Sequence, residues 1–305
     1  MSGSIARAPR GPHLVVVPQA QPVDLREIPR PAQNKESALD ELNSLVGLTQ
    51  VKNLVFEIYA YSEVRRKREK AGLSNENTVL HMVFKGNPGT GKTTVARIIG
   101  RLLFEAGLLQ KGHLVEVERA DLVGEYVGHT AQRTREQIRK AQGGILFIDE
   151  AYSLVRGGEK DFGKECIDCL VKGMEDNAND TVFILAGYPS EMEQFLRSNP
   201  GLRSRFPIHL DFPDYTVEDL LKIADLMVRK RDYRFSDDAR ATLEDIVKDK
   251  MSRETIPSNA RLVRNLIEKA IRRQAVRLVR EKCFTRQDLM LITSRELLEA
   301  AYGVV

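Results

Sequence analysis

The chain has 305 residues, of which 42% are hydrophobic and 30% charged, enough apolar material for a buried core in two domains. No run of about eighteen apolar residues occurs, and the first residues lack the basic and then apolar layout of a secretory signal. We therefore expect no membrane span, no export and a cytoplasmic location. The net charge of +4, from 47 basic and 43 acidic residues, is too balanced to indicate a nucleic-acid partner.

The predicted elements begin after a proline-rich tail. Six of the 12 prolines fall within residues 1–31, so we expect residues 1–36 to be disordered, with the run LVVVP as a possible docking strand. Helical periodicity follows and ends near Gly72; its apolar positions are Val51, Leu54, Val55 and Ile58.

Residues 80–212 alternate between short apolar runs and helix-like stretches, a pattern typical of a parallel sheet with helices on both faces. The apolar runs are LHMVF, HLVEV, ILFID, TVFILAG and PIHLDF. After residue 212 only helical patterns remain, at 216–231, 237–250 and 259–281. The predicted fold is an α/β domain over residues 37–212 followed by a small all-α domain over residues 213–305.

The cysteines and histidines do not indicate a metal site. Cys166 and Cys169 form a C-x-x-C, but they lie in a stretch with helical spacing, and Cys283 is distant. Three cysteines make no disulfide framework, and one helical turn is a poor zinc site. The five histidines are scattered without ligand spacing, so we expect buried structural thiols and no zinc.

The first predicted strand leads into GNPGTGKTT, which has the form G-x-x-x-x-G-K-[ST] of a phosphate-binding loop. Its glycines let successive N–H groups point at phosphate oxygens, and the following helix adds the positive end of its dipole. Lys92 is placed to reach the β- and γ-phosphates and the Thr93 hydroxyl to bind Mg²⁺. The residues predicted to bind the nucleotide here are Gly86, Asn87, Pro88, Gly89, Thr90, Gly91, Lys92, Thr93 and Thr94.

A second acidic element follows in GGILFIDEA, residues 143–151. Its apolar residues predict a buried strand, whose end presents Asp149 to the Mg²⁺ and leaves Glu150 to orient or deprotonate water. Two adjacent carboxylates are costly to bury without a cation. Together with Lys92, they indicate a nucleotide-hydrolysing enzyme.

The segment ADLVGEYVGHT places Tyr126, Val127 and Gly128 in a loop between the second and third predicted strands. An exposed Tyr-Val pair costs solvation free energy unless something packs on it. The loop therefore either grips an extended polypeptide or folds back on its own core.

The segments GNPGTGKTTVARIIG, VGEYVGHTA, GGILFIDEAYSL, ILAGYP and NPGLRSRF together resemble AAA+ ATPases. The similar branch contains stage V sporulation protein K and the red-type Rubisco activase, and the resemblance covers about residues 39–279. The segment GGEKDFGKE and the general spacing are more similar to the sporulation side of this branch.

The resemblance implies a homo-oligomeric, hexameric ring that uses ATP and Mg²⁺ to remodel a client protein, with the helical domain as a lid. It places the Tyr126 loop in the central pore and Val46 and Gly47, within LVGL, at the adenine. Arg261 in SNARLVRN matches the lid arginine that senses the γ-phosphate, with Arg264 as the second choice. Tyr188 in AGYP stands where most AAA+ enzymes have a polar Asn or Thr sensor, so its role is open.

The segment NPGLRSRFP, residues 199–207, holds two arginines without an obvious partner nearby in the sequence. In a ring, a cation at the subunit edge can stabilise the phosphoryl group transferred in the neighbouring subunit. The resemblance assigns this arginine-finger role to Arg205, with Arg203 as the alternative. Two solvated surface arginines are the other interpretation.

The function favoured by the sequence is an ATP-hydrolysing ring that remodels a client protein in sporulation. A Rubisco-activase-like remodeller, a nucleic-acid motor or clamp loader, and a nucleotide-dependent scaffold are the alternatives. No residue pattern identifies the client.

Overall fold

The computed structural model of the protein describes residues 37–74, 79–126, 128–156, 162–177, 180–281 and 285–303, all within one compact unit, Glu36–Val305. The predicted tail, residues 1–36, lies outside the described residues, and so does Cys283. Within the described ranges, no helix combines the length and the apolar character that a bilayer span requires.

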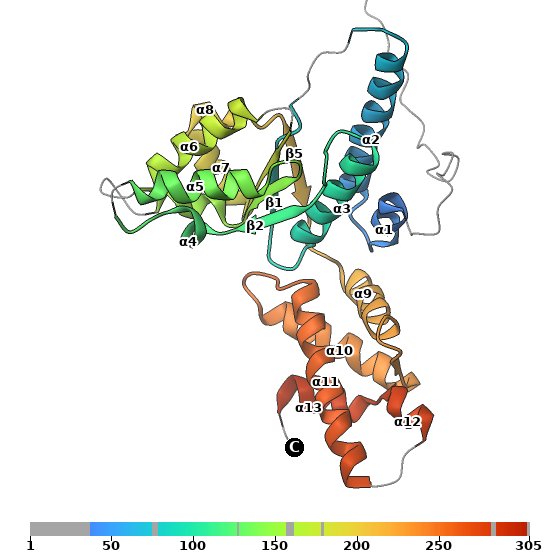
Figure 1. Ribbon diagram of the computed structural model, residues 1–305. Helices are drawn as coiled ribbons and strands as arrows, with labels where there is room; N and C mark the ends of the chain where they lie inside the picture. The colour runs from blue at the N-terminus through green and yellow to red at the C-terminus, as the bar shows by residue number, and fades with distance from the viewer. Residues whose placement is uncertain are drawn as a thin grey trace, which may run out of the picture. The chain divides into compact units, whose positions relative to one another are not determined.

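A parallel sheet with strand order β2-β3-β4-β1-β5 occupies the first part of this unit (Figure 1). Each of the five apolar runs predicted as strands forms one of these strands. β3 and β4 are buried at every position, as expected for inner strands covered on both faces. The strands are β1 (Met82–Gly86), β2 (Leu114–Val117), β3 (Ile145–Ile148), β4 (Val182–Gly187) and β5 (Ile208–Phe212).

Alternate strand residues divide the core between the two faces of the sheet. Phe84 and Phe147 pack in the cluster that includes α1, α2 and α3, whereas Val83 and Leu146 pack in the cluster that includes α5, α6 and α7. Figure 1 shows the two groups of helices on opposite sides of the sheet. The helices of this part are α1 (Ala38–Ser44), α2 (Thr49–Lys70), α3 (Lys92–Glu105), α4 (Arg119–Leu122), α5 (His129–Lys140), the 3-10 helix η2 (Ala151–Val155), α6 (Gly163–Asp176), α7 (Pro189–Ser198) and α8 (Pro200–Arg203).

The predicted helical domain follows the sheet, but it also contains two short strands that the sequence pattern missed. These strands, β6 (Arg234–Phe235) and β7 (Leu291–Ile292), pair in parallel, and two residues are too few to show a period of two. Its helices are α9 (Val217–Arg229), α10 (Asp237–Arg253), α11 (Ala260–Glu281), α12 (Arg286–Met290) and α13 (Ser294–Tyr302). The last two lie beyond the helical patterns identified in the sequence.

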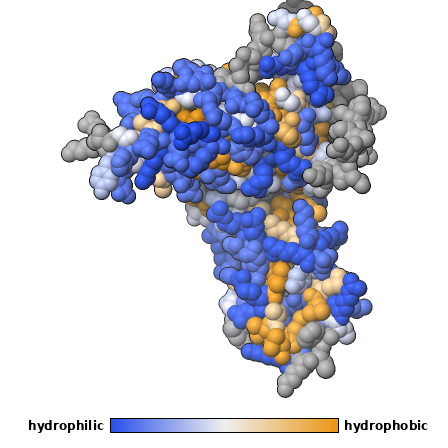
Figure 2. All heavy atoms as spheres, viewed as in Figure 1, coloured by the Kyte–Doolittle hydropathy of each residue, from blue (hydrophilic) through white to orange (hydrophobic). Residues whose placement is uncertain are grey.

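Apolar side chains lie on the surface of the helical domain. Figure 2 shows them on the visible face of this domain among polar groups. The exposed large apolar residues of α11 and α12 include Val276, Val279 and Leu289, and Val279 is 77% exposed. Isolated exposed apolar residues are ordinary, but an apolar area of this kind is also typical of a surface that another molecule covers.

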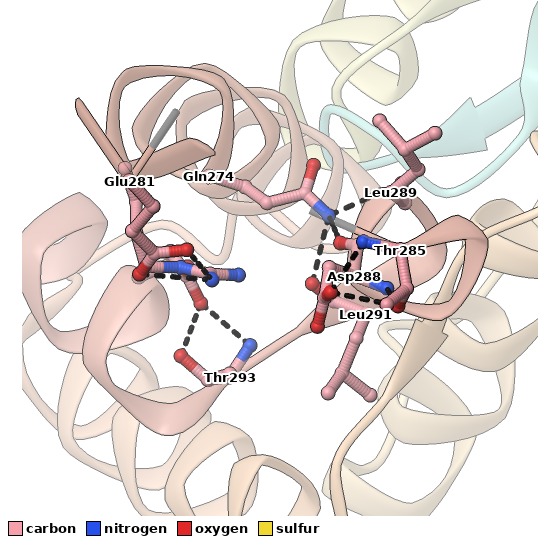
Figure 3. A network of polar contacts seen from close by, with 9 residues as sticks. Gln274, Glu281, Thr285, Asp288, Leu289, Leu291 and Thr293 are labelled. Atoms are coloured by element: carbon pink, nitrogen blue, oxygen red, sulfur yellow. Dashed lines mark hydrogen bonds and ion pairs between the residues drawn. The ribbon is translucent and has the colours of Figure 1, made fainter. Parts of the chain in front are cut away.

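A buried amide ties α11 to the end of the helical domain (Figure 3). Gln274 is 2% exposed, and its side-chain NH₂ group donates only to backbone carbonyls. These bonds satisfy a polar group that would be costly to bury unpaired. The accepting carbonyl oxygens belong to Asp288 (2.9 Å), Leu289 (3.2 Å) and Leu291 (2.8 Å).

Cys166 is fully buried in α6, where its sulfur accepts a hydrogen bond from the Thr134 hydroxyl (3.4 Å). Burial raises the pKa of the Cys166 thiol to about 12, so the thiol is protonated and unreactive near neutral pH. The prediction of a buried structural thiol is confirmed for Cys166, and Cys169 is half-buried.

Candidate functional site

The predicted site residues come together at one edge of the sheet. Because β3, β4 and β1 are parallel and adjacent in that order, their carboxyl ends lie next to one another. The phosphate loop follows β1, Tyr188 follows β4, and Asp149 and Glu150 follow β3. Ligands of open α/β folds bind beyond this edge.

The loop from Gly86 to α3 has the backbone form that an anion site requires. Gly89 has φ of +73° and Gly91 has φ of +99°, both in the left-handed region that favours glycine. The buried Thr90 hydroxyl donates to the Asn87 carbonyl (2.8 Å) and closes the loop. Backbone N–H groups and the start of α3 can then face the same anion.

Lys92, the first residue of α3, points back over this loop. Its Nζ donates to the carbonyl oxygens of Gly86 (2.8 Å) and Asn87 (2.9 Å). These bonds hold the ammonium group at the place where a phosphate would meet it.

The charges of three other predicted residues act on Lys92. Burial lowers the pKa of Lys92, the carboxylates of Asp149 and Glu150 oppose that effect, and the positive charge of Arg261 adds to it. The structure therefore brings the loop lysine, the acidic pair and Arg261 into one electrostatic environment, although they come from three separate segments.

The acidic pair extends β3. The Asp149 N–H donates to the Val117 carbonyl (2.9 Å) and continues the β2–β3 ladder, while the Asp149 carboxylate accepts from the Glu150 N–H (3.0 Å). Glu150 is exposed and has φ of +47°, a conformation that carries strain in a residue with a side chain.

Thr93 and Thr94 follow Lys92 in α3. The Thr93 hydroxyl faces Glu116 of β2, whose carboxylate lies 3.5 Å away, whereas Thr94 is exposed. Glu116 did not stand out in the sequence, because a single charged residue within a strand resembles an ordinary solvated position.

Tyr188 lies between the phosphate loop and the acidic pair in the order of the strands. Its ring contacts the ring of Tyr152 from η2, with centroids 6.0 Å apart and planes at 47°. The guanidinium of Arg156 lies over the ring of Tyr152, 4.7 Å from its centroid. Tyr152 and Arg156 were not predicted as neighbours of the site.

The segment predicted to contact adenine also reaches the phosphate loop. Gly47 has φ of +63°, and a Cβ added there would lie 3.6 Å from the Tyr215 ring. The Tyr215 hydroxyl donates to the Thr90 carbonyl (3.1 Å), and Val46 is half-buried beside Gly47. Tyr215, itself only 8% exposed, was missed because its contacts are distant in sequence.

Of the two lid arginines, Arg261 lies in the first turn of α11, directly after Ala260, whose N–H donates to the Gly89 carbonyl (3.2 Å). Arg264 is exposed farther along the same helix. The structure thus places Arg261 next to the phosphate loop.

Arg205 has a partner, contrary to the expectation from the sequence. Its guanidinium donates to the Gly201 carbonyl (2.7 Å) in α8 and to the carboxylate of Glu175 in α6. The sequence concealed this pair because Glu175 is 30 residues away. Arg203, the last residue of α8, is exposed.

Tyr126 is 67% exposed, so the alternative in which it folds back on the core is wrong. Its ring meets the His129 ring edge to face, with centroids 5.4 Å apart. Gly128, with φ of +82°, precedes α5, and Val127 lies outside the described residues.

Two family models match the chain: "ATPase family associated with various cellular activities (AAA)" over residues 82–214 and "AAA lid domain" over residues 216–302. Stage V sporulation protein K of Bacillus subtilis is 57% identical over 260 residues, which are 84% of this chain and 80% of that protein. The chain is an AAA+ ATPase.

This AAA+ ATPase is also 44% identical to the chloroplastic ribulose bisphosphate carboxylase/oxygenase activase of Cyanidioschyzon merolae, over 87% of this chain and 92% of that protein. Among solved structures, the FIGL-1 AAA domain matches with a TM-score of 0.59 at 18% identity, covering 90% of this chain and 85% of that one. A point mutant of Thermotoga maritima RuvB matches with a TM-score of 0.58 at 22% identity, covering 88% and 75%. These two structures support the fold alone. The predicted family, fold and ATP-hydrolysing activity are confirmed.

Proposed function

We propose that this AAA+ ATPase forms a hexameric ring that remodels a client protein through the Tyr126 loop, in a process of sporulation. The observation that carries the proposal is Tyr126 itself, a large aromatic side chain that is 67% exposed and lies two residues before Gly128, whose φ is positive. Such an aromatic side chain can contact an extended polypeptide without reading its sequence. The relative with 57% identity is named as a sporulation protein, whereas the Rubisco activase shares 44%, so a Rubisco-directed role is the alternative.

The residues at the phosphate loop fit Mg²⁺-bound ATP. The Thr93 hydroxyl and the Asp149 carboxylate are hard oxygen donors, the kind that Mg²⁺ takes while it keeps water and phosphate ligands. When bound, Mg²⁺ supplies positive charge at the phosphates. Lys92, already held over the loop by its two carbonyl partners, would exchange them for phosphate oxygens.

Hydrolysis needs a water molecule and a stabilised phosphoryl group. We assign Glu150, exposed beside Asp149, to orient and deprotonate the water. Arg205 of a neighbouring subunit would stabilise the transferring group, and it must leave Glu175 to do so. Arg203 is the alternative finger.

The remaining residues are assigned to recognition of the nucleotide. Val46 and Gly47 would contact adenine next to Tyr215, and Arg261 would sense the γ-phosphate, with Arg264 as the alternative. Tyr188, which lies between the loop and the acidic pair in the order of the strands, would stand at the sensor position, where its phenol could hydrogen-bond.

The proposed finger implies a ring, and an exposed apolar surface supports it. A finger that acts on the neighbouring nucleotide makes each site incomplete without a second subunit, and head-to-tail packing closes into a ring when the rotation allows it. The exposed apolar residues of α11 and α12, including Val276 and Val279, are suited to burial in such a contact.

A client trap tests the remodelling proposal. The Glu150→Gln variant should bind ATP without hydrolysing it and so retain a bound client. It would be purified with and without Tyr126→Ala from growing and from sporulating cells, and the proteins recovered with it would be identified by mass spectrometry. We expect a sporulation protein that is enriched with Tyr126 and lost with Tyr126→Ala.

Other results would contradict the proposal in different ways. A well-formed ring that retains nothing favours a scaffold, and recovery that nuclease abolishes favours a nucleic-acid motor. Retention of Rubisco from carbon-fixing cells favours the Rubisco-directed alternative. A client that stays bound despite Tyr126→Ala contradicts the role of the loop.

A further inference from the structure

The helical domain touches the phosphate loop through the turn that precedes α11. A Cβ added at Gly89 would lie 2.4 Å from the Ser258 carbonyl oxygen and 2.9 Å from the Arg261 nitrogen, so only glycine lets the two backbones approach this closely. The Ala260 N–H also donates to the Gly89 carbonyl (3.2 Å). The first turn of α11 is therefore in direct contact with the loop.

Asn259 lies at the centre of this contact. It is 2% exposed and has φ of +50°, a left-handed conformation that Asn tolerates better than most residues. Its side-chain NH₂ group donates to the Pro88 carbonyl (3.2 Å) and to the Asp214 carboxylate (2.8 Å), and its side-chain oxygen accepts from the Tyr215 N–H (2.9 Å). One amide thus joins the phosphate loop, the segment between β5 and α9, and the helical domain.

Asp214 strengthens this connection. Its carboxylate also accepts from the side-chain amide of Asn87, at 3.0 and 2.9 Å, so a second residue of the phosphate loop is bound to the same partner. The phosphate loop is therefore bound at three consecutive residues: at Asn87 by Asp214, at Pro88 by Asn259 and at Gly89 by the Ala260 N–H.

A buried amide with all its groups paired often has only a structural role. Asn259 differs because the turn that it fixes also carries Arg261, two residues farther along. A Cβ added at Gly89 would lie 3.2 Å from the Arg261 Cβ, so Arg261 lies directly at the phosphate loop. Any shift of the turn would move that charge relative to the phosphates.

We propose that Asn259 is a positioning residue for ATP hydrolysis, which holds Arg261 at the phosphate loop and makes the helical domain follow the nucleotide state of that loop. The inference rests on the proposed role of Arg261 at the γ-phosphate. Asn259 binds the loop backbone, so it acts through Arg261 and not on the nucleotide. A nucleotide that shifts the loop then shifts the helical domain by the same coupling.

The Asn259→Gly variant tests the proposal, because glycine keeps the left-handed backbone and removes the amide. Gln274→Ala is the matched control: it removes another amide that is 2% exposed, whose bonds all lie within the helical domain. We expect Asn259→Gly to lower kcat, and the preference for β,γ-imido-ATP over ADP, by roughly tenfold each. Gln274→Ala should leave kcat and the nucleotide preference within about twofold of the wild type. Asn259→Gly and Gln274→Ala should each lower the thermal midpoint of unfolding.

The double variant Asn259→Gly, Arg261→Ala tests whether Asn259 acts through Arg261. If Asn259 acts through Arg261, the double variant has the kcat of Arg261→Ala alone, whereas two losses that multiply would overturn the proposal. A wild-type kcat and nucleotide preference in Asn259→Gly, with only a lower thermal midpoint, would overturn it as well. Failure of the client trap would contradict the remodelling function without affecting these measurements.

Discussion

Glu150 has a backbone conformation that suits other residue types better than glutamate. The left-handed region costs an L-residue with a side chain about 1–2 kcal/mol, and Asn adopts it more readily. Glu150 has φ of +47° there, between the end of β3 and the start of η2. Strain of this kind persists where the surrounding structure enforces it and is typical of functional positions. Activity and stability should therefore oppose each other at this residue.

We predict that Glu150→Asn and Glu150→Gln both lose ATP turnover, by roughly 10² to 10⁴, because both remove the carboxylate. Only Glu150→Asn should gain free energy of unfolding, by about 1 kcal/mol, since glutamine has the same backbone preference as glutamate. Urea denaturation at fixed protein concentration, together with an ATPase assay, measures both quantities. Equal stability of the two variants would contradict the strain, and full turnover in either would contradict the role in hydrolysis.

His81 makes stability depend on pH. It is 2% exposed between the rings of Phe183 and Phe206, and its Nδ1 accepts from the Phe183 N–H (3.3 Å). Burial lowers the pKa of His81 from 6.5 to about 4. The unfolded chain therefore takes up a proton at higher pH than the folded chain, and the stability that neutral His81 contributes is present above pH 6.5 and lost as the pH falls towards 4.

We predict that the free energy of unfolding falls by about 2 kcal/mol through His81 alone between about pH 7 and pH 5. Denaturant titrations of the wild type and of His81→Leu at these two pH values measure the free energy of unfolding. The contribution of His81 is the difference between the pH dependences of the two proteins. The variant loses an acceptor for the Phe183 N–H and is less stable at neutral pH, but that loss does not change with pH. Identical pH dependence in the two proteins would show that the pKa of His81 is the same in the folded and unfolded chains, and would contradict the prediction.

At the residue scale, the sequence predicted site residues whose partners are close in sequence and missed residues whose partners are distant in sequence. Gly89, Gly91, Lys92 and the Asp149–Glu150 pair could be predicted as site residues because the proposed role of each depends on neighbours within a few positions. Asn259 was not found, because its partner Pro88 is 171 positions away. No spacing rule reports a contact that only the packing of two domains creates.

At the element scale, α6 and α8 hold the proposed finger. Arg205 is bound by the Gly201 carbonyl and by Glu175, so its guanidinium is already ordered near the surface. We predict that Arg205→Ala binds ATP normally but loses roughly 10³ to 10⁵ in turnover, the range known for arginine fingers. Arg203→Ala should lose far less, and comparison of the two by steady-state ATPase assays decides between the candidates.

Mixing two inactive variants shows whether the finger acts between subunits. Lys92→Ala subunits lack nucleotide binding but keep Arg205, and Arg205→Ala subunits bind nucleotide but lack the finger. A mixture should recover activity that neither variant has alone, because some sites then combine a bound nucleotide with an intact neighbour. A mixture as inactive as its components would assign Arg205 a role within its own subunit.

Regular elements of ordinary length were predictable, and short ones were not. Strands β1 to β5 each have four or more residues, most of them apolar, and the alternation with helices makes them recognisable. β6 and β7 have two residues each, and their pairing joins segments that are distant in sequence, so no local pattern reports it. The short helix α8 begins at Pro200 inside a segment that reads as a loop.

At the scale of the whole molecule, a finger in trans predicts that a single subunit is nearly inactive. ATP turnover per subunit should therefore fall when the enzyme is diluted below the concentration at which the ring dissociates. The exposed Val276 and Val279 would return to water at the same step. The test measures ATP turnover per subunit and the mass of the assembly over a wide range of protein concentration. Turnover and assembly mass should fall at the same concentration.

The control uses subunits that cannot hydrolyse ATP. An excess of Lys92→Ala chains added to diluted enzyme should restore turnover, because each still supplies Arg205 and its apolar surface to a wild-type neighbour. The same mass of an unrelated protein should not, since crowding favours compact states by less than about 1 kcal/mol. Constant turnover per subunit at every dilution, with monomers as the measured species, would mean that each subunit carries a complete site and that the ring serves the client rather than the chemistry.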